Sequence, residues 1–472
     1  MPRSVRIGVI GAGSAVFSLG LVKDICLTPN LDGSEISFMD VDPERLDVIH
    51  RLAERYATEL GANLHFEKTQ DRQAALRDAD FVINTAYPLG HHHARRMREL
   101  TDRHGYYYGA VGLGSYYEFA LQMAVARDME RICPDAWLIQ SGNPVFDGST
   151  LMTRETDLKI IGLCHGHYGY LEICRVLGLD PARVTWEAPG LNHCIWLTQF
   201  RYDGEDAYPI LDQWIEQKGE EYWREHVATR THDIQMSRGT IHQYRMYGLM
   251  PIGDTPRGER NTYSWWYHTD WETKRFWFGE PFGGPDTEFA RRQYVADHEK
   301  TMREIAQVAN DPHSKISDVL GTSKTREQQL PIIDALTNNA TGRFQVNVPN
   351  RGTIDGIPDD VVVECQAEID ATGVHRIKPT PLPRKVMLEQ VLPRWLEMER
   401  NVESYRSGDL GMLLWSALTN HQTRTYEQAV EALQDLLAMP EHAELRDHYK
   451  GFDGTGARWE RPAAVEASDL GG

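Results

Sequence analysis

The sequence has few cysteines and no long apolar run, and each shortage excludes a class of protein. Six cysteines among 472 residues are too few for a disulfide framework, which favours reduced thiols and a cytoplasmic location. No stretch of about 18 apolar residues is present, so we expect neither a transmembrane helix nor a membrane partner. Repeats and low-complexity segments are missing as well, which leaves an ordinary globular chain.

Positive charge is also scarce. Lys and Arg number 50 against 69 Asp and Glu, a formal net charge of −19. Such a chain repels phosphate backbones unless it carries a local basic patch. The stretch from His91 to Arg96 comes nearest to a patch, but it holds too few cationic groups. We therefore expect a small-molecule partner rather than a nucleic acid.

The first 200 residues alternate apolar, β-branched runs with helical patterns, which predicts an α/β fold with a doubly wound parallel sheet of the Rossmann type. Beyond about residue 200 the pattern loosens. We expect one domain over 1–198 and a second α/β domain over 199–472. Strands are expected at 5–10, 36–40, 81–84, 137–139, 160–163 and within 345–369, and later helices at 287–309 and 384–405.

A glycine turn separates the first strand from the following helical pattern. Gly11 and Gly13 in that place direct backbone N–H groups and a helix N-terminus toward a pyrophosphate. Val16 replaces the third glycine of the usual motif. Asp40 ends the next strand, where a carboxylate can bind ribose hydroxyls and repel a 2′-phosphate, which favours NAD over NADP. A tight strand–helix turn with a capping Asp is the structural alternative.

Two separate Cys–His and Asn–His elements predict a metal site. Cys164 and His165 directly follow a predicted strand, and Asn192 and His193 come later, after another strand-to-loop transition. A thiolate and an imidazole are good ligands for a divalent transition metal, and two protein ligands leave the open positions that catalysis needs. A small buried cysteine and a hydrogen-bonded core histidine are the alternatives.

Two further polar elements are candidates for substrate contact. Asp254 and Arg257 lie in a loop rich in Gly and Pro, where a charged pair can serve a site, although a surface ion pair is commoner. Asn143 precedes Pro144 at a strand end, where it can bind a hydroxyl or simply terminate the strand.

Taken together, these elements resemble the family-4 glycoside hydrolases, and within them the α-glucosidase and α-galactosidase branch. The resemblance extends from Ile7 to about Tyr449. The order of the Cys–His and Asn–His elements is more telling than the glycine turn. The matching segments are 8–18, 39–42, 80–86, 142–144, 162–169, 190–193, 250–257, 346–350, 355–356 and 363–364.

The resemblance implies hydrolysis of α-glycosides, with α-glucosides first, by a redox route instead of the usual two carboxylates. In that route NAD takes a hydride from C3 of the sugar, and a base then removes the acidified C2 proton. A divalent metal, usually Mn²⁺, stabilises the enediolate. Elimination of the leaving group, addition of water and return of the hydride complete the cycle. An α-galactosidase, an α-glucuronidase or an α-galacturonidase is the alternative within the family.

The resemblance implies that residues 1–198 bind NAD. It also implies that residues 199–472 form a domain like that of lactate and malate dehydrogenases, which serves the substrate, the metal site and oligomerisation. It further implies a homodimer or homotetramer and a role for each candidate residue. Asp254 is the expected base and His165 the expected acid or hydroxyl ligand. The other implied roles are metal binding by Cys164 and His193; substrate binding by Asn143, Arg257 and His193; and cofactor binding by Gly11, Gly13, Ser14, Asp40 and Asn84.

The sequence departs from the family at Ser115, where related α-glucosidases carry an Asp before the pair of tyrosines. The sugar therefore stays open at this point. Two other classes share the expected fold. A lactate/malate-type dehydrogenase would need net NADH production and an Arg–Asp–His set that we do not find. A non-catalytic dinucleotide-binding regulator would leave the Cys164 and His193 pair without a purpose.

Overall fold

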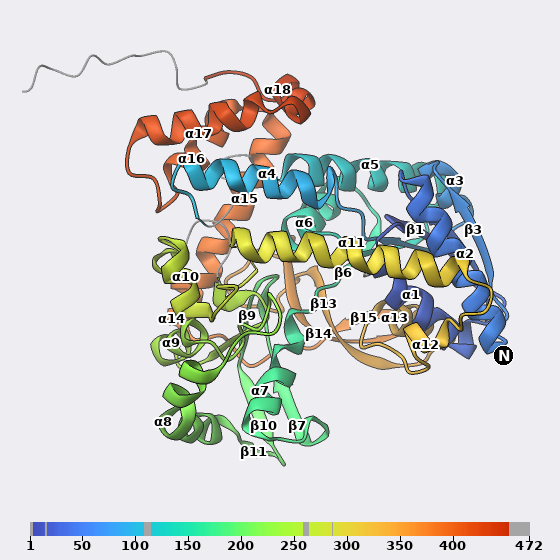
Figure 1. Cartoon of the computed structure of the whole chain (residues 1–472), viewed down its shortest axis with the longest axis horizontal. Helices are drawn as coiled ribbons and strands as arrows, with labels where there is room; N and C mark the ends of the chain where they lie inside the picture. The colour runs from blue at the N-terminus through green and yellow to red at the C-terminus, as the bar shows by residue number, and fades with distance from the viewer. Residues whose placement is uncertain (1–2, 15–16, 108–114, 258–263, 286, 453–472) are drawn as a thin grey trace, which may run out of the picture.

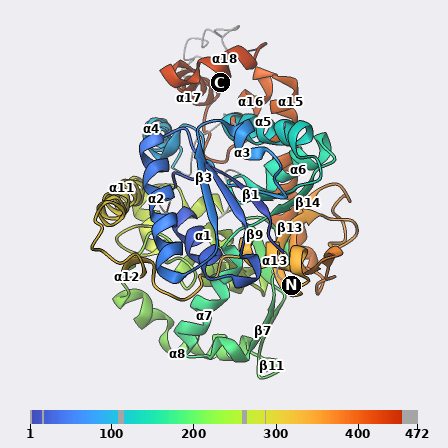
Figure 2. The same cartoon turned by 90° about the vertical axis from the view of Figure 1, so that its right-hand side faces the viewer.

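The computed structural model describes residues 3–14, 17–107, 115–257, 264–285 and 287–452 (Figure 1). Most of these residues surround one large sheet, with helices on both of its sides (Figure 2). Across these ranges, no helix is both long and apolar enough to cross a membrane.

Residues 6–162 form the parallel half of the sheet. Its order is β3-β2-β1-β4-β5-β6, and every neighbouring pair is parallel. This is the order of a Rossmann sheet, which reverses direction between β1 and β4, so the predicted fold class is confirmed. The strands are β1 (Arg6–Ile10), β2 (Glu35–Met39), β3 (His65–Thr69), β4 (Phe81–Asn84), β5 (Trp137–Gln140) and β6 (Lys159–Gly162).

Helices connect these strands, and local capping sets their ends. In α2 the Asp42 carboxylate accepts from the N–H groups of Glu44 and Arg45, and Gly61 ends the helix in the left-handed region with φ 69°. The apolar face of α2 is buried against the sheet. The helices are α1 (Phe17–Cys26), α2 (Pro43–Leu60), α3 (Arg72–Leu76), α4 (Gly90–Arg103), α5 (Tyr116–Ile132) and α6 (Val145–Glu155).

The sheet continues beyond β6 as an antiparallel half. Asn347 of β13 pairs with Gly162 of β6, and the order continues β13-β14-β8-β9-β12, with β15 beside β14. One sheet thus contains strands from both sides of residue 198, and the domain division there stays a prediction. The strands are β8 (Gly190–Leu191), β9 (Cys194–Leu197), β12 (Met250–Ile252), β13 (Gly342–Pro349), β14 (Val362–Asp370) and β15 (Gly373–Arg376).

Smaller elements surround this half. A three-stranded sheet contains β7 (Val184–Glu187), β10 (Gln199–Tyr202) and β11 (Glu205–Asp206). The middle helices are α7 (Gly169–Leu177), α8 (Tyr208–Glu225), α9 (Arg238–Tyr247), α10 (Trp271–Phe278), α11 (Glu288–Asn310), α12 (Ser317–Leu320) and α13 (Gln329–Asn338). The long α11 confirms the helix expected over 287–309 and runs beside α2 and α4 (Figure 1).

The described helices after residue 409 form a hydrophobic cluster with α4 and the start of α5 (Figure 1), whereas those of 384–407 pack on the main core. The helix expected over 384–405 is interrupted by a π-helical segment at Met387–Val391. Pro393, just beyond it, has no N–H for the regular helical hydrogen bond, which accounts for the irregularity. The helices are α14 (Arg384–Val386), α15 (Leu392–Ser407), α16 (Leu410–Leu418), α17 (Tyr426–Ala438) and α18 (Ala443–His448).

Candidate active site

The glycine turn lies between β1 and α1, as the sequence predicts. The Gly11 N–H donates to the carbonyl oxygen of Met39, at 2.9 Å. Gly11 has φ 88°, and a Cβ at this position would lie 2.6 Å from backbone atoms of Ala86. Only glycine therefore allows the backbone of this turn to approach the end of β4 so closely.

Asp40 closes the same turn. Its carboxylate accepts from the N–H groups of Gly13 at 2.7 Å and Asp42 at 2.9 Å. Ser14 donates its N–H to the carbonyl oxygen of Gly11 at 3.3 Å, and its Oγ accepts from the first N–H of α1. Val16 lies outside the described residues. A carboxylate has further lone pairs, so closing the turn leaves Asp40 able to accept from a ligand hydroxyl.

Asn84 ends β4 and is buried. Its Nδ2 donates to Gln140 Oε1 at 2.9 Å, and its Oδ1 accepts from the Ala86 N–H at 3.2 Å. The side chain therefore joins the ends of β4 and β5 at the edge where the cofactor is expected. A direct contact of Asn84 with a cofactor stays a prediction.

His193 occupies the tip of the β8–β9 hairpin. Leu191 pairs with Cys194, so the turn consists of Asn192 and His193, and His193 has a left-handed φ of 62°. A Cβ at Gly190 would lie 2.0 Å from the carbonyl oxygen of Cys194, so the hairpin requires glycine there. The tight pairing holds the imidazole at a defined place.

A buried carboxyl supports this hairpin from β14. Glu364 Oε2 accepts from Asn192 Nδ2 at 3.0 Å, and Oε1 lies 3.4 Å from Gln345 Nε2. Burial raises the pKa of Glu364, against the opposing effect of these hydrogen bonds and of the nearby His193. Sequence reasoning assigned no role to Glu364, although a charge within the buried run 361–365 was a signal.

Asp254 and Arg257 meet His193 because β12 pairs with β9, with Ile252 opposite Ile195. Asp254 Oδ2 lies 3.3 Å from His193 Nε2, and Oδ1 lies 3.1 Å from Arg257 Nε. The His193 side chain is 10% exposed and that of Asp254 30%. The predicted Asp254–Arg257 pair and the separately predicted His193 therefore form one partly exposed cluster at the edge of the sheet.

The Cys164 loop follows β6 and touches the same cluster. A Cβ on Gly253 would lie 2.4 Å from Gly166 Cα, so this loop packs directly against the turn that carries Asp254. The Cys164 thiol is half-buried. In the same loop, burial lowers the pKa of His167 to about 3. Within the described ranges, no three or more His, Cys, Asp and Glu side chains are arranged to hold a metal ion.

His165 pairs with a residue that sequence reasoning missed. Its Nε2 lies 2.8 Å from each carboxylate oxygen of Glu327, just before α13. Burial by itself would lower the pKa of His165, but the hydrogen bond to Glu327 and the charges of Glu327 and Asp254 outweigh it and raise the pKa. The two residues are 162 positions apart, and no motif links them.

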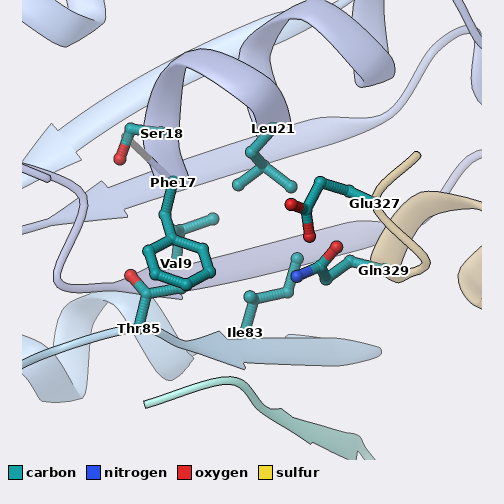
Figure 3. Close-up of a pocket in the computed structure, with 8 residues that line it drawn as sticks. All are labelled: Val9, Phe17, Ser18, Leu21, Ile83, Thr85, Glu327 and Gln329. Carbon is teal, nitrogen blue, oxygen red and sulfur yellow. The ribbon is translucent and has the colours of Figure 1, made fainter. Parts of the chain in front are cut away.

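A narrow pocket, open to solvent, lies between β1, β4, α1 and the start of α13 (Figure 3). Glu327 and Gln329 line one side of it, opposite Phe17 and Thr85 (Figure 3). Its place beside the β1–β4 reversal is where Rossmann sheets bind ligands.

Asn143 and Ser115 are the two remaining residues that the sequence analysis singled out. Asn143 is exposed just after β5, at the same edge of the sheet. Ser115 is buried directly before α5. The ring of Tyr116 lies 4.9 Å from His448 and that of Tyr117 5.7 Å from His442, so the start of α5 contacts the C-terminal helices. Residues 108–114 are outside the described part.

An imidazole, a carboxylate and a guanidinium thus meet beside the β8–β9 hairpin, and the loop that carries the Cys164 thiol and the His165 imidazole packs against the turn of Asp254. Such a set can bind a metal, hold a polar substrate and move protons. The fold and this set of groups define an α/β enzyme of the Rossmann type.

The chain belongs to the Family 4 glycosyl hydrolases. Residues 6–179 match the family itself, and residues 188–423 match its C-terminal domain. The protein is therefore a glycoside hydrolase, and the predicted family is confirmed.

Relatives differ in the substrates for which they are named. The chain is 27% identical to an alpha-galactosidase of Bacillus subtilis over 401 residues, 81% of this chain and 85% of that protein. It is also 27% identical to an alpha-glucosidase of Erwinia rhapontici over 402 residues, covering 79% and 85%. Other relatives are named 6-phospho-beta-glucosidase or alpha-galacturonidase. Family membership alone therefore leaves the sugar open.

The fold agrees with solved structures. A 6-phospho-alpha-glucosidase from gut microorganisms, solved in complex with NAD and Mn²⁺, superimposes with a TM-score of 0.73. The match covers 92% of this chain and 98% of that one, at 18% identity. At this identity the likeness supports the fold.

Proposed function

We propose that this enzyme hydrolyses α-glycosides with NAD and a divalent metal, Mn²⁺ first, and that α-glucosides are the first substrates to test. α-Galactosides, α-glucuronides and α-galacturonides are the alternatives. The observation that carries the proposal is the meeting of His193, Asp254 and the Cys164 loop at one edge of the sheet. Two of the relatives are named alpha-galactosidase and alpha-glucosidase.

The residues of the glycine turn fit an NAD cofactor. At Gly11 and Gly13 a Cβ would meet Ala86 and the Asp40 carboxylate, so the glycines keep the turn between β1 and α1 tight, as in turns that bind a pyrophosphate at the helix start. Ser14 precedes α1, Asp40 would accept from the ribose, and Asn84 shapes the end of β4 beside them. When bound, NAD supplies an acceptor for a hydride from C3 of the sugar, and the same hydride returns at the end.

The chemistry of Cys164 and His193 fits a transition metal. A half-buried thiol and an imidazole are suitable donors. Among the described residues, no group of three or more His, Cys, Asp and Glu side chains is arranged around a metal position. A site of two protein ligands leaves coordination positions to substrate oxygens. When bound, the metal supplies positive charge beside the C2 and C3 oxygens.

The remaining roles belong to side chains of the chain itself. Asp254 accepts the C2 proton of the oxidised sugar, and Arg257 holds its carboxylate in place at 3.1 Å. His165 donates a proton to the leaving group or binds a hydroxyl. Asn143, Arg257 and His193 orient the sugar.

We place the enzyme in the cytoplasm as a homodimer or homotetramer, with the division into domains near residue 198. All six cysteines are free thiols, and a thiol ligand requires reducing conditions.

The test is hydrolysis of p-nitrophenyl α-glucoside, α-galactoside, α-glucuronide and α-galacturonide under reducing conditions, with and without NAD⁺ and Mn²⁺. Nitrophenol release that requires both additives, without accumulation of NADH, supports the redox mechanism and identifies the sugar. Nitrophenol release that is independent of NAD⁺ contradicts the mechanism, and steady NADH formation would favour a dehydrogenase.

A further inference from the structure

The interaction between His165 and Glu327 links the loop of Cys164 to the pocket beside α1. His165 follows the thiol proposed as a metal ligand, and Glu327 lines the pocket beside α1 (Figure 3). Both carboxylate oxygens lie 2.8 Å from the same ring nitrogen, Nε2. The Phe17 ring lies 5.7 Å from the imidazole, so the ring also has an aromatic neighbour from α1.

The backbone beside Glu327 is held by contacts with two other segments. The Glu327 N–H donates to Thr325 Oγ1 at 3.0 Å, and the Thr325 N–H donates to the buried carboxylate of Asp24 in α1 at 2.7 Å. The Tyr168 hydroxyl donates to the carbonyl oxygen of Arg326. The Glu327 side chain therefore extends from a fixed stretch of backbone toward His165.

A hydrogen bond at Nε2 has a consequence for the other ring nitrogen. With Nε2 held by the carboxylate, Nδ1 is the atom through which His165 can exchange a proton or hydrogen bond with a ligand. We propose that Glu327 is a positioning residue, which fixes the imidazole of His165 so that Nδ1 meets the leaving-group oxygen. This proposal rests on the proposed function and adds a residue to it.

A plain surface ion pair is the competing explanation. The His165 side chain is 51% exposed, and exposed pairs contribute little to stability. The chain offers a matched pair in His92 and Glu299, whose Nε2 and Oε1 lie 2.9 Å apart, with side chains 60% and 43% exposed. If both pairs are only surface contacts, removing either carboxylate should have the same small effect.

The experiment compares Glu327→Gln, Glu299→Gln, His165→Ala and the double variant of His165 and Glu327. The kcat and KM are measured on the glycoside that the wild type hydrolyses, with NAD⁺ and Mn²⁺. We expect Glu327→Gln to lower kcat about 10- to 100-fold with KM changed little, as for other residues that orient a functional histidine. Glu299→Gln should match the wild type.

Coupling between the two residues decides the result. When His165 is already Ala, Glu327→Gln should cost nothing further, because it acts through the imidazole. An equal loss in both backgrounds, or an unchanged kcat in the single variant, would overturn the proposal. A lowered melting temperature with a proportional loss of active enzyme would also overturn it, because the role would then be structural.

A second measurement needs no turnover. If no glycoside is hydrolysed by the wild type, the proposed function fails. Crystal structures of the wild type and of Glu327→Ala, which has no acceptor for Nε2, still report the ring of His165. A rotated or disordered imidazole in the variant supports positioning. The same ring orientation in both proteins refutes it.

Discussion

The two halves of the sheet build their parts of the site in different ways. In the parallel half, Gly11, Gly13 and Asp40 stand at the ends of neighbouring strands, and the carboxyl ends of parallel strands share one edge. In the antiparallel half, His193 is at a hairpin tip and Asp254 follows a short strand that pairs beside it. The residues proposed for the cofactor can therefore be located from the order of strands, whereas those proposed for the sugar depend on pairing between distant segments.

The largest loss of activity is expected from a substitution of Cys164, which lies where the parallel and antiparallel halves of the sheet join. Because a hydroxyl is a far weaker ligand than a thiolate, Cys164→Ser should lower kcat/KM by about 10³-fold or more. NAD⁺ binding should be unchanged, because the glycine turn is intact. Cys133→Ser, at the end of α5, is the control and should stay active. A fully active Cys164→Ser enzyme would contradict the metal assignment.

Replacing one glycine in each half of the sheet by alanine should affect different properties, stability in one half and NAD⁺ binding in the other. A Cβ at Gly190 would lie 2.0 Å from the Cys194 carbonyl oxygen, so Gly190→Ala should destabilise the fold by about 3 kcal/mol and abolish hydrolysis. Gly11→Ala should mainly weaken NAD⁺ binding, because the turn must move away from Ala86. Thermal unfolding and NAD⁺ titration of both variants check this, and the same loss of NAD⁺ affinity in both would break the comparison.

The pair of His93 and His442 joins α4, in the parallel half, to the C-terminal helices, and we expect it to make stability depend on pH. His93 Nε2 lies 2.8 Å from His442 Nε2, and burial lowers the pKa of His93 from 6.5 to about 4. The unfolded chain therefore binds a proton first, and stability should fall as the pH drops below about 6.5. We expect His93 to account for about 2 kcal/mol of this loss at pH 5 relative to pH 7.

Urea unfolding of the wild type and of His93→Asn at both pH values measures this contribution. The variant should lose less stability than the wild type on acidification, since Asn does not titrate. Glu441, Arg96 and Arg446 are the charged neighbours of the pair, and they remain in both proteins. Identical pH dependence in the two proteins would show that His93 is not the titrating group.

The smallest effect is expected at Asp40. In Asp40→Asn the amide would keep an oxygen for the Gly13 N–H but lose the charge that repels a 2′-phosphate, so the preference for NAD over NADP should fall about tenfold. Affinities for both cofactors measure the change. Asp71→Asn, which alters a similar cap at the start of α3, should leave the preference unaltered. If Asp40→Asn keeps the same preference for NAD over NADP, the role of Asp40 is limited to its hydrogen bonds within the turn.

The sequence predicted elements best where burial left a clear pattern. β1, β2, β4, β5 and β6 are buried apolar runs and were all expected. β3 was not, because Phe66 is its one buried residue and it lies at the sheet edge. The same holds for side chains. Glu327 has no motif around it, and its importance comes entirely from the contact with His165.

The sequence by itself determined the family, the strands of the parallel half other than β3, the glycine turn and the types of side chain available for chemistry. These follow from local patterns, because propensity, hydrophobic periodicity and glycine requirements act over a few neighbouring residues. Only the tertiary structure decided that His193 meets Asp254, that Glu364 lies buried behind the hairpin and that Glu327 pairs with His165. Those contacts depend on strand register and packing between distant segments, which local sequence does not encode.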